Sequence, residues 1–321
     1  MLSDKVKKVL EKQHYAVVGN HAAVQICRWT KKSLTNNGFC YKQKFYGIKS
    51  HRCCQMSPAV MWCQNMCVHC WRPIELNLGK ELGNIDDPKE IIENCLEAQR
   101  KMISGFGGNK NVKKKKFEEA QEPDQFAISL SGEPTLYSKL PELIRELRKM
   151  KKSSFLVTNG LSPEAISKLK KEKAMPTQLY ISLNTPNEKM YNEWHKPSIK
   201  DAWKKFNKSL EIMKSLKGKT RTVLRMTLVK DKNLCCEKEY ANLIKKAMPD
   251  FIEVKGFMSV GYSRQRLGYE TMPSHNQVLE FSKRLVKELK QGYKILDEKK
   301  ESRVVLLGTD KKKMNIKRSE V

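Results

Sequence analysis

The chain has 321 residues, of which 39% are hydrophobic, enough to form one large domain or two small ones around a buried core. Its 63 lysines and arginines outnumber its 35 aspartates and glutamates, and the resulting formal charge of +28 favours a polyanionic partner such as nucleic acid. A lysine-rich composition without such a partner is the alternative. The composition excludes a disordered chain, and the lack of any run of eighteen apolar residues excludes a membrane-spanning helix.

Residues 1–56 are predicted to form an N-terminal extension that carries the first cysteines. Ser3 is placed to cap a short helix, and irregular or helical structure is expected from there to Gln55. Within this extension Cys27, Cys40 and Cys53 follow one another at intervals of thirteen residues. Ten cysteines in all, without a secretory leader, predict a protein of the reducing cytoplasm, where thiols bind metals instead of forming disulfides.

A larger unit, residues 57–308, is predicted from alternating strands and helices. The first expected strand, Ala59–Trp62, leads into a loop with three further cysteines, and a helix follows from Asp87 to Ile103. Residues 105–123 show no hydrophobic period and are predicted to be an exposed, irregular insertion. Five more strands are expected at residues 126–130, 155–158, 178–183, 222–229 and 251–257. Helices are expected between them at residues 140–151, 163–172, 200–216 and 237–248.

Six strand-helix units with mostly apolar strands predict an α/β fold built on a parallel sheet that helices cover. Because eight units close a full TIM barrel, six predict a partial (βα)6 barrel, whose chemistry lies on the loops after the strands. A helix at residues 275–289 and a hairpin of 293–296 with 303–307 are expected to complete it. Residues 309–321 are predicted to be a disordered basic tail.

The three cysteines of the first loop carry the sharpest chemical signal. Cys63, Cys67 and Cys70 form a C-x3-C-x2-C pattern, which matches neither the paired knuckles of a zinc ribbon nor the four-cysteine run of a ferredoxin. A cubane iron-sulfur cluster held by three thiolates keeps one iron open for another ligand. The pattern resembles that of the radical S-adenosylmethionine (SAM) enzymes, with His69 where they usually place an aromatic residue that packs beside the adenine. A structural zinc site is the alternative.

The resemblance to the radical SAM enzymes also assigns residues at the ends of the later strands. Ser131, Gly132 and Glu133 stand where the superfamily has a Gly-Gly-Glu-Pro motif, which implies that Glu133 meets the amino group of SAM. Short polar side chains at the next strand ends suit recognition of hydroxyl and carboxylate groups. They are Thr158, Asn159, Ser182 and Asn184. Arg225 is expected to bind a carboxylate of SAM or of a second substrate, and a structural ion pair is the alternative.

The N-terminal triplet narrows the resemblance to one family. The run from Cys40 to Cys53, followed by Gln55-Met56-Ser57-Pro58, resembles the tRNA 4-demethylwyosine synthases, and so does the run from Val254 to Arg264. The likeness covers essentially the whole chain, although the family more commonly has Asp-Ala where Asn184-Thr185 stands here. It implies an enzyme that condenses N1-methylguanosine at position 37 of tRNA-Phe with two carbons of pyruvate, using SAM and two [4Fe-4S] clusters.

For the second cluster the family resemblance implies Cys27, Cys40 and Cys53 as ligands, with pyruvate at the open iron. Lys42 matches the family position of a lysine that forms an imine with pyruvate, and Lys44 is the alternative. Basic side chains are expected to contact the tRNA. They are Arg28, Lys31, Lys32, Arg52, Arg264 and Arg266. Three aromatic side chains are expected to stack on the splayed base, namely Trp29, Tyr41 and Tyr262.

The chain lacks a flavodoxin-like phosphate loop, so a separate electron donor of the flavodoxin or ferredoxin type is expected, together with an archaeal origin and a monomeric state. Two other functions stay open from the sequence. Another two-cluster radical SAM tRNA enzyme, such as a methylthiotransferase, is disfavoured because no appended RNA-binding barrel is recognisable. A metal-stabilised RNA-binding protein would carry the same cysteines without cleaving SAM.

Overall fold

The computed structural model of the chain describes residues 1–290 and 292–321. Its strands form one ten-stranded sheet in the order β1-β2-β3-β4-β5-β6-β7-β8-β10-β9. The strands are β1 Ala16–Val18, β2 Ala22–Gln25, β3 Cys53–Ser57, β4 Gln125–Ile128, β5 Ser153–Thr158, β6 Gln178–Ser182, β7 Arg221–Leu228, β8 Phe251–Gly256, β9 Lys294–Lys299 and β10 Val304–Gly308. Each neighbouring pair from β3 to β8 is parallel, which confirms the expected partial (βα)6 barrel.

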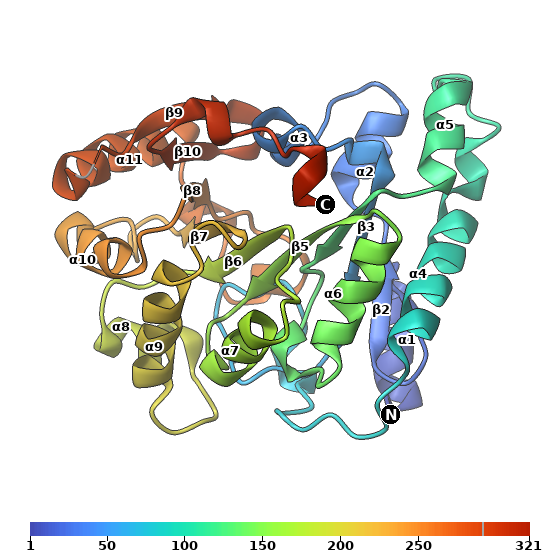
Figure 1. Ribbon diagram of the computed structural model, residues 1–321, viewed down its shortest axis with the longest axis horizontal. Coiled ribbons are helices and arrows are strands. Elements are labelled where there is room, and N and C mark those ends of the chain that lie inside the picture. Colours follow the sequence, from blue (N-terminus) through green and yellow to red (C-terminus); the bar gives the residue numbers. More distant parts are fainter. Residues whose placement is uncertain (291) are drawn as a thin grey trace.

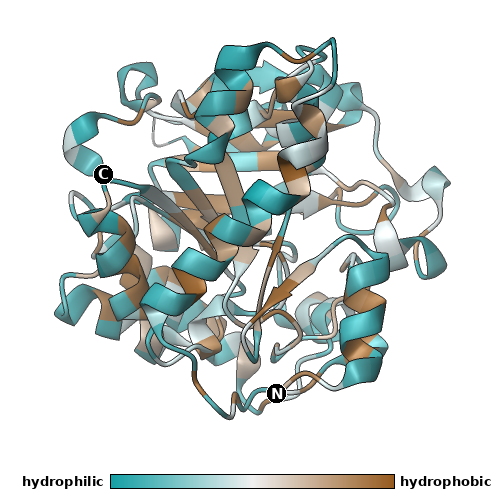
Figure 2. Ribbon diagram, turned by 90° about the vertical axis from the view of Figure 1, so that its right-hand side faces the viewer, coloured by the Kyte–Doolittle hydropathy of each residue, from teal (hydrophilic) through white to brown (hydrophobic). Residues whose placement is uncertain are grey.

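Helices that follow the strands cover the outer face of the sheet (Figure 1). The helices are α1 Asp4–Lys12, α2 Arg28–Leu34, α3 Tyr41–Tyr46, α4 Pro88–Ile103, α5 Lys114–Gln121, α6 Leu140–Lys149, α7 Pro163–Lys171, α8 Glu188–His195, α9 Ala202–Lys214, α10 Glu237–Ala247 and α11 His275–Leu289. Figure 2 shows their hydrophilic sides turned outward and their hydrophobic sides turned to the sheet. None of the helices in the described ranges is long and apolar enough to cross a membrane.

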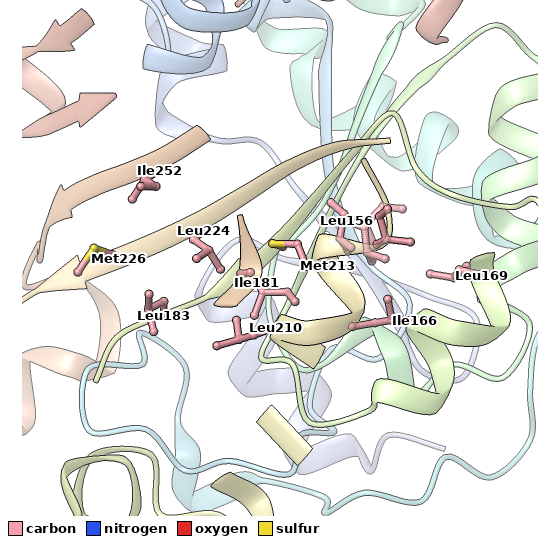
Figure 3. Packing of buried hydrophobic residues seen from close by; sticks show 14 of the residues in the cluster. Leu156, Ile166, Leu169, Ile181, Leu183, Leu210, Met213, Leu224, Met226 and Ile252 are labelled. Atoms are coloured by element: carbon pink, nitrogen blue, oxygen red, sulfur yellow. The ribbon is translucent and has the colours of Figure 1, made fainter. Parts of the chain in front are cut away.

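The main core lies between the sheet and these helices. Leu156, Ile181 and Leu224 come from three neighbouring strands and share one buried cluster with Leu210 and Met213 of α9 (Figure 3). Because successive residues of a strand point to opposite faces, their sequence neighbours point into the barrel. The outer core is therefore mainly apolar, and the inner face is left to build a site.

Helix α3 closes the barrel at the end where its strands begin. Phe45 and Tyr46 of α3 share a second buried cluster with Phe155, Tyr180 and Phe251, which are inward residues of β5, β6 and β8. The ring of Tyr46 lies 5.9 Å from that of Phe155 and 5.8 Å from that of Phe251, both edge-on. A segment from the N-terminal extension thus forms the floor of the barrel interior.

The first barrel strand differs from the expected one. β3 is Cys53–Ser57, and the apolar run Ala59–Trp62 lies in the buried loop that follows. Pro58 has no N–H to donate to a neighbouring strand, so the ladder ends before it. The residues before β3 also include the β1–β2 hairpin, which the sequence did not predict and which continues the same sheet through β2.

The insertion at residues 105–123 is not irregular throughout, because Lys114–Gln121 form α5. This helix is mostly charged but has a small apolar side, where Phe117 and Ala120 pack with Ile26 and Leu34 of the N-terminal segment. Tertiary contacts therefore stabilise this helix, which its own sequence pattern does not predict. Helix α8 was missed as well, since eight residues are too few for a clear period.

The expectation of a disordered tail after Thr309 is wrong. Met314 is buried in the cluster that contains α3, and the Ile316 N–H donates to the carbonyl oxygen of Tyr46 at 3.1 Å. Arg221 of β7 donates to the carbonyl oxygen of Met314 at 2.6 Å. Although this segment is rich in basic residues, it is anchored by these contacts and packs beneath the barrel floor.

Candidate functional site

A cavity of about 450 Å³ occupies the barrel interior, and Lys42 of α3 is part of its wall. All six cysteines of the two triplets line it, namely Cys27, Cys40, Cys53, Cys63, Cys67 and Cys70. Cys53 is the first residue of β3, whereas Cys63 belongs to the loop after that strand. The two triplets therefore face one cavity from opposite ends of the strands.

The thiols of both triplets fit iron ligation. Burial raises the pKa of Cys63 to about 11 and that of Cys40 to about 12, and it also raises the pKa of Cys27, Cys53 and Cys67. Such thiols ionise when a metal replaces the proton. Within the described ranges no three His, Cys, Asp or Glu side chains are arranged to bind a single metal ion.

A buried arginine shapes the Cys63–Cys70 loop. Arg72 is 2% exposed and donates to the carbonyl oxygens of Met61 at 3.2 Å and Asn65 at 2.8 Å. The thiol of Cys67 lies 3.0 Å from Nδ1 of His195, the last residue of α8. Sequence reasoning missed His195 because the helix that carries it was not predicted.

Arg266 supports the same loop from the other side. Its guanidinium donates to the carbonyl oxygen of Val68 at 3.1 Å and to that of Cys70, and it pairs with Glu75 at 3.0 Å. These partners occupy the donors that a phosphate would need. We therefore assign Arg266 to positioning the loop, in place of the tRNA contact that the sequence suggested.

The Ser131-Gly132-Glu133 segment meets the loop after β3 at very short range. Gly132 has a φ of +71°, and a Cβ at this position would lie 1.8 Å from the carbonyl oxygen of Ala59, so only glycine fits. Ser131 Oγ donates to the carbonyl oxygen of Val60 at 2.7 Å. The segment is thereby fixed at the edge of the cavity.

Glu133 is held by the ends of two strands. Its carboxylate accepts from Thr158 Oγ1 at 2.6 Å and from the Asn159 N–H at 2.8 Å. Burial raises the pKa of the Glu133 carboxyl, and these hydrogen bonds oppose that shift. The side-chain amide of Asn159 also lies 3.7 Å from the sulfur of Cys63. Glu133, Thr158 and Asn159 thus form one wall beside the Cys63–Cys70 loop.

His69 lies against the aromatic side of the cavity. Its ring stacks on Trp194 with 5.7 Å between the ring centroids, and its Nε2 is 3.4 Å from the side-chain amide of Asn184. Burial lowers the pKa of His69 to about 4, so the ring is neutral at pH 7. Its Nδ1 is buried without a partner in the described part of the chain, which fits a ligand beside it. Ser182 lines the cavity nearby.

Lys42 and Lys44 have different surroundings although both lie on α3. The ammonium of Lys42 lies 4.9 Å from the ring centroid of Phe155 and 4.5 Å from that of Tyr180, inside the barrel. Burial lowers the pKa of Lys42, although Glu253 opposes this shift. The Lys44 side chain is 40% exposed and pairs with Asp297 at 2.7 Å. The structure therefore favours Lys42 over Lys44.

Strands β7 and β8 carry further charged residues on the inner side of the barrel. Their register pairs Arg225 with Glu253 and Thr227 with Lys255. Glu253 is fully buried and accepts from the hydroxyls of Tyr41 and Tyr46 at 2.8 Å each. Tyr41 is therefore not free to stack on a base, contrary to the expectation from the sequence. Burial lowers the pKa of Lys255 to about 7. Inward alternation along β8 is the signal that points to both residues.

The remaining basic residues expected at tRNA lie in three settings. Arg28 and Lys31 are exposed on α2, where Lys32 also lies over the ring of Trp29 at 5.4 Å. Arg52 instead pairs with Asp124 at 3.1 Å. Arg264 is exposed and lies 5.7 Å from the ring of Tyr269.

Known proteins resemble the chain in sequence and in structure. The family model of the radical SAM superfamily matches residues 58–244, and that of wyosine base formation matches residues 246–309. The S-adenosyl-L-methionine-dependent tRNA 4-demethylwyosine synthase of Pyrococcus abyssi is 50% identical over 310 residues, which cover 96% of this chain and 90% of the relative. The synthase of Methanocaldococcus jannaschii is 39% identical and matches 99% of this chain and 100% of its own. A solved structure of TYW1 with a lysine-pyruvate adduct bound covers 99% of both chains, with a TM-score of 0.86 and 36% identity.

Proposed function

Because the chain belongs to the family of S-adenosyl-L-methionine-dependent tRNA 4-demethylwyosine synthases within the radical SAM superfamily, we propose that the barrel cavity is its reaction chamber. There N1-methylguanosine at position 37 of tRNA-Phe is condensed with two carbons of pyruvate. The enzyme acts as a monomer in the cytoplasm. The observation that carries this proposal is that both cysteine triplets, Lys42 and Glu133 line one cavity.

Each triplet binds one [4Fe-4S] cluster. Cys63, Cys67 and Cys70 would hold one of these clusters, which with SAM and an electron from an external flavodoxin or ferredoxin would supply radical chemistry toward the N1-methyl group. Glu133 accepts a hydrogen bond from the SAM amino group, and the neutral ring of His69 packs beside the adenine. Arg72 and Arg266 keep the loop in place while these groups bind.

At the other end of the cavity Lys42 holds pyruvate. Its neutral amine adds to the keto carbon, two proton transfers follow, and the former carbonyl oxygen leaves as water to give an imine. The buried aromatic wall of Phe155 and Tyr180 favours the neutral amine and keeps out the water that would hydrolyse the imine. The lysine-pyruvate adduct named for the solved TYW1 structure supports this step.

Metal content tests the two-cluster proposal. Iron, acid-labile sulfide and zinc are measured after anaerobic reconstitution in the wild type and in a Cys27→Ala, Cys40→Ala, Cys53→Ala variant. About eight irons falling to about four are expected, because a cubane holds four. A Cys235→Ala, Cys236→Ala variant is the control, since these thiols lie outside the cavity wall. One cluster in both proteins, or zinc without iron, would contradict the proposal.

Lys42 is tested by trapping the imine. Incubation with pyruvate and borohydride is expected to give wild-type protein a stable adduct in its intact mass, and Lys42→Met none. Formation of the tricyclic base falls at least about 100-fold in this variant, because the substrate carbon is no longer held in place. Lys44→Met retains both the adduct and the activity, since Lys44 pairs with Asp297 outside the cavity. An adduct on Lys42→Met would place the imine elsewhere.

A further inference from the structure

The wall formed by β7 and β8 carries two cations to which the imine step gives no role. Arg225 and Lys255 lie on neighbouring strands, in the successive pairs Arg225–Glu253 and Thr227–Lys255. Since residues two apart on a strand share a face, both side chains point to the inside of the barrel. Both line the cavity that Lys42 also lines.

Neither cation has a direct ion-pair partner in the described part of the chain. Across residues 1–290 and 292–321, no carboxylate comes within the 4.0 Å of an ion pair with Arg225 or Lys255. The ammonium of Lys255 donates to the carbonyl oxygen of Gly256 at 3.2 Å. Glu253 is the carboxylate of this wall, and two tyrosine hydroxyls occupy its oxygens. The single carboxylate of Glu253 acts on both cations from a distance, so the wall keeps an excess of positive charge that an anion from outside the chain can balance.

The position of this wall relative to Lys42 indicates which anion. The Lys42 amine lies over Tyr180, and Tyr180 pairs with Val223 of β7. Arg225 stands two residues further along the same strand, and Lys255 faces the position two residues beyond that. Along the strands toward their C-terminal ends, the level of the Lys42 amine therefore comes first, that of Arg225 second and that of Lys255 third. In an α-keto acid the carboxylate is bonded directly to the keto carbon, so an amine at that carbon brings the carboxylate toward these cations.

We propose that Arg225 and Lys255 form the subsite for the carboxylate of the keto acid, and that the Lys42 amine adds to the keto carbon of the same molecule. This inference rests on the proposed function. The two cations act as positioning residues that align the keto carbon with the amine and reject ketones without a carboxylate, through charge-assisted hydrogen bonds. The methionyl carboxylate of SAM is the other carboxylate in the reaction, and the experiment separates the two.

The experiment measures imine trapping with two ketones in reconstituted holoenzyme. Pyruvate carries the charge, and its neutral amide, pyruvamide, keeps the same keto group. Lys255→Met and Arg225→Met are each expected to raise the half-saturating pyruvate concentration about 10- to 100-fold, as loss of a hydrogen bond to a charged group does. The value for pyruvamide stays within about twofold. Lys255→Arg restores most of the pyruvate affinity, and Lys44→Met matches the wild type with both ketones.

Iron content and the KM for SAM are measured on the same preparations, so that a misassembled variant is recognised and replaced by its conservative partner, Lys255→Arg or Arg225→Lys. Equal weakening toward pyruvate and pyruvamide overturns the subsite, and so does unchanged trapping of pyruvate. A raised KM for SAM with normal pyruvate trapping assigns the cations to SAM and also overturns it. A wild type that traps no pyruvate overturns the imine at Lys42 itself, before any variant of this wall is compared.

Discussion

At the scale of single residues, Gly132 sets how closely the strand ends meet the cluster loop. A Cβ there would lie 1.8 Å from the carbonyl oxygen of Ala59, which belongs to the backbone and cannot move aside alone. Gly132→Ala is therefore expected to displace the loop, lower the melting temperature and reduce the iron retained by the Cys63 triplet. Thermal unfolding and iron content after reconstitution measure this.

Gly218→Ala separates the clash from backbone strain. Gly218 has a φ of +78° and nothing within 4 Å of its Cβ position, so alanine there costs only about 1 kcal/mol for the conformation. Its iron content is expected to equal that of the wild type. Similar behaviour of the two variants would mean that the contact with Ala59 does not shape the loop.

At the scale of elements, the C-terminal segment supports α3 and through it Lys42. Met314 is 6% exposed in the cluster with Tyr46 and Phe251, so Met314→Ala is expected to lower the free energy of unfolding by about 2 kcal/mol or more. Lys311 is exposed in the turn just before Met314, so the free energy of unfolding of Lys311→Ala is expected to stay within about 0.5 kcal/mol of the wild-type value. Chemical denaturation at equal iron loading measures both. Equal stabilities would show that the segment does not support the barrel floor.

The elements also show which parts of the fold the sequence could predict. The five later strands and the long helices alternate with clear apolar periods, and the structure has them within a few residues of the expected bounds. α5 and the C-terminal segment escaped prediction because lysines dominate their sequences while one or two buried side chains, such as Ala120 and Met314, decide their structure. The β1–β2 hairpin escaped because three- and four-residue strands carry too little pattern.

The residues of the candidate site also differ in how well the sequence predicts them. The cysteines, Lys42 and Glu133 belong to motifs with fixed spacing, and the structure gathers them around one cavity. Lys255 reaches that cavity through the inward alternation of β8, and His195 through a short helix that the sequence pattern does not predict. Arg266 was misassigned because its sequence neighbourhood does not reveal the carbonyl groups of Val68 and Cys70 that bind it.

At the scale of the whole molecule, the charge of +28 predicts tRNA binding that depends steeply on salt. Each neutralised phosphate contributes about 0.7 to 0.9 to the slope of log affinity against log salt, so about six contacts would lower the affinity roughly 1,000-fold between 50 and 200 mM. Filter binding over this range measures the slope. A flat dependence would mean that the excess charge reflects composition and not a nucleic-acid surface.

A pair of variants locates this surface. Arg28→Ala with Lys31→Ala removes two exposed charges of α2 and is expected to reduce the slope by about 1.5. Lys204→Ala with Lys208→Ala removes two exposed charges of α9, which lies well apart from α2 (Figure 1), and is expected to leave the slope unchanged. The opposite result would move the tRNA surface to the α9 side.

Strand β3 has one further consequence, because its first residue, Cys53, belongs to one cysteine triplet and the loop after its last residue carries the other. At a rise of about 3.3 Å per residue, its first and last residues lie about 13 Å apart. β2 and β4 hold it on both edges, so it can neither stretch nor slide. The separation of the two triplets is therefore set by the length of one strand, and a residue inserted into or removed from β3 would move one triplet relative to the other.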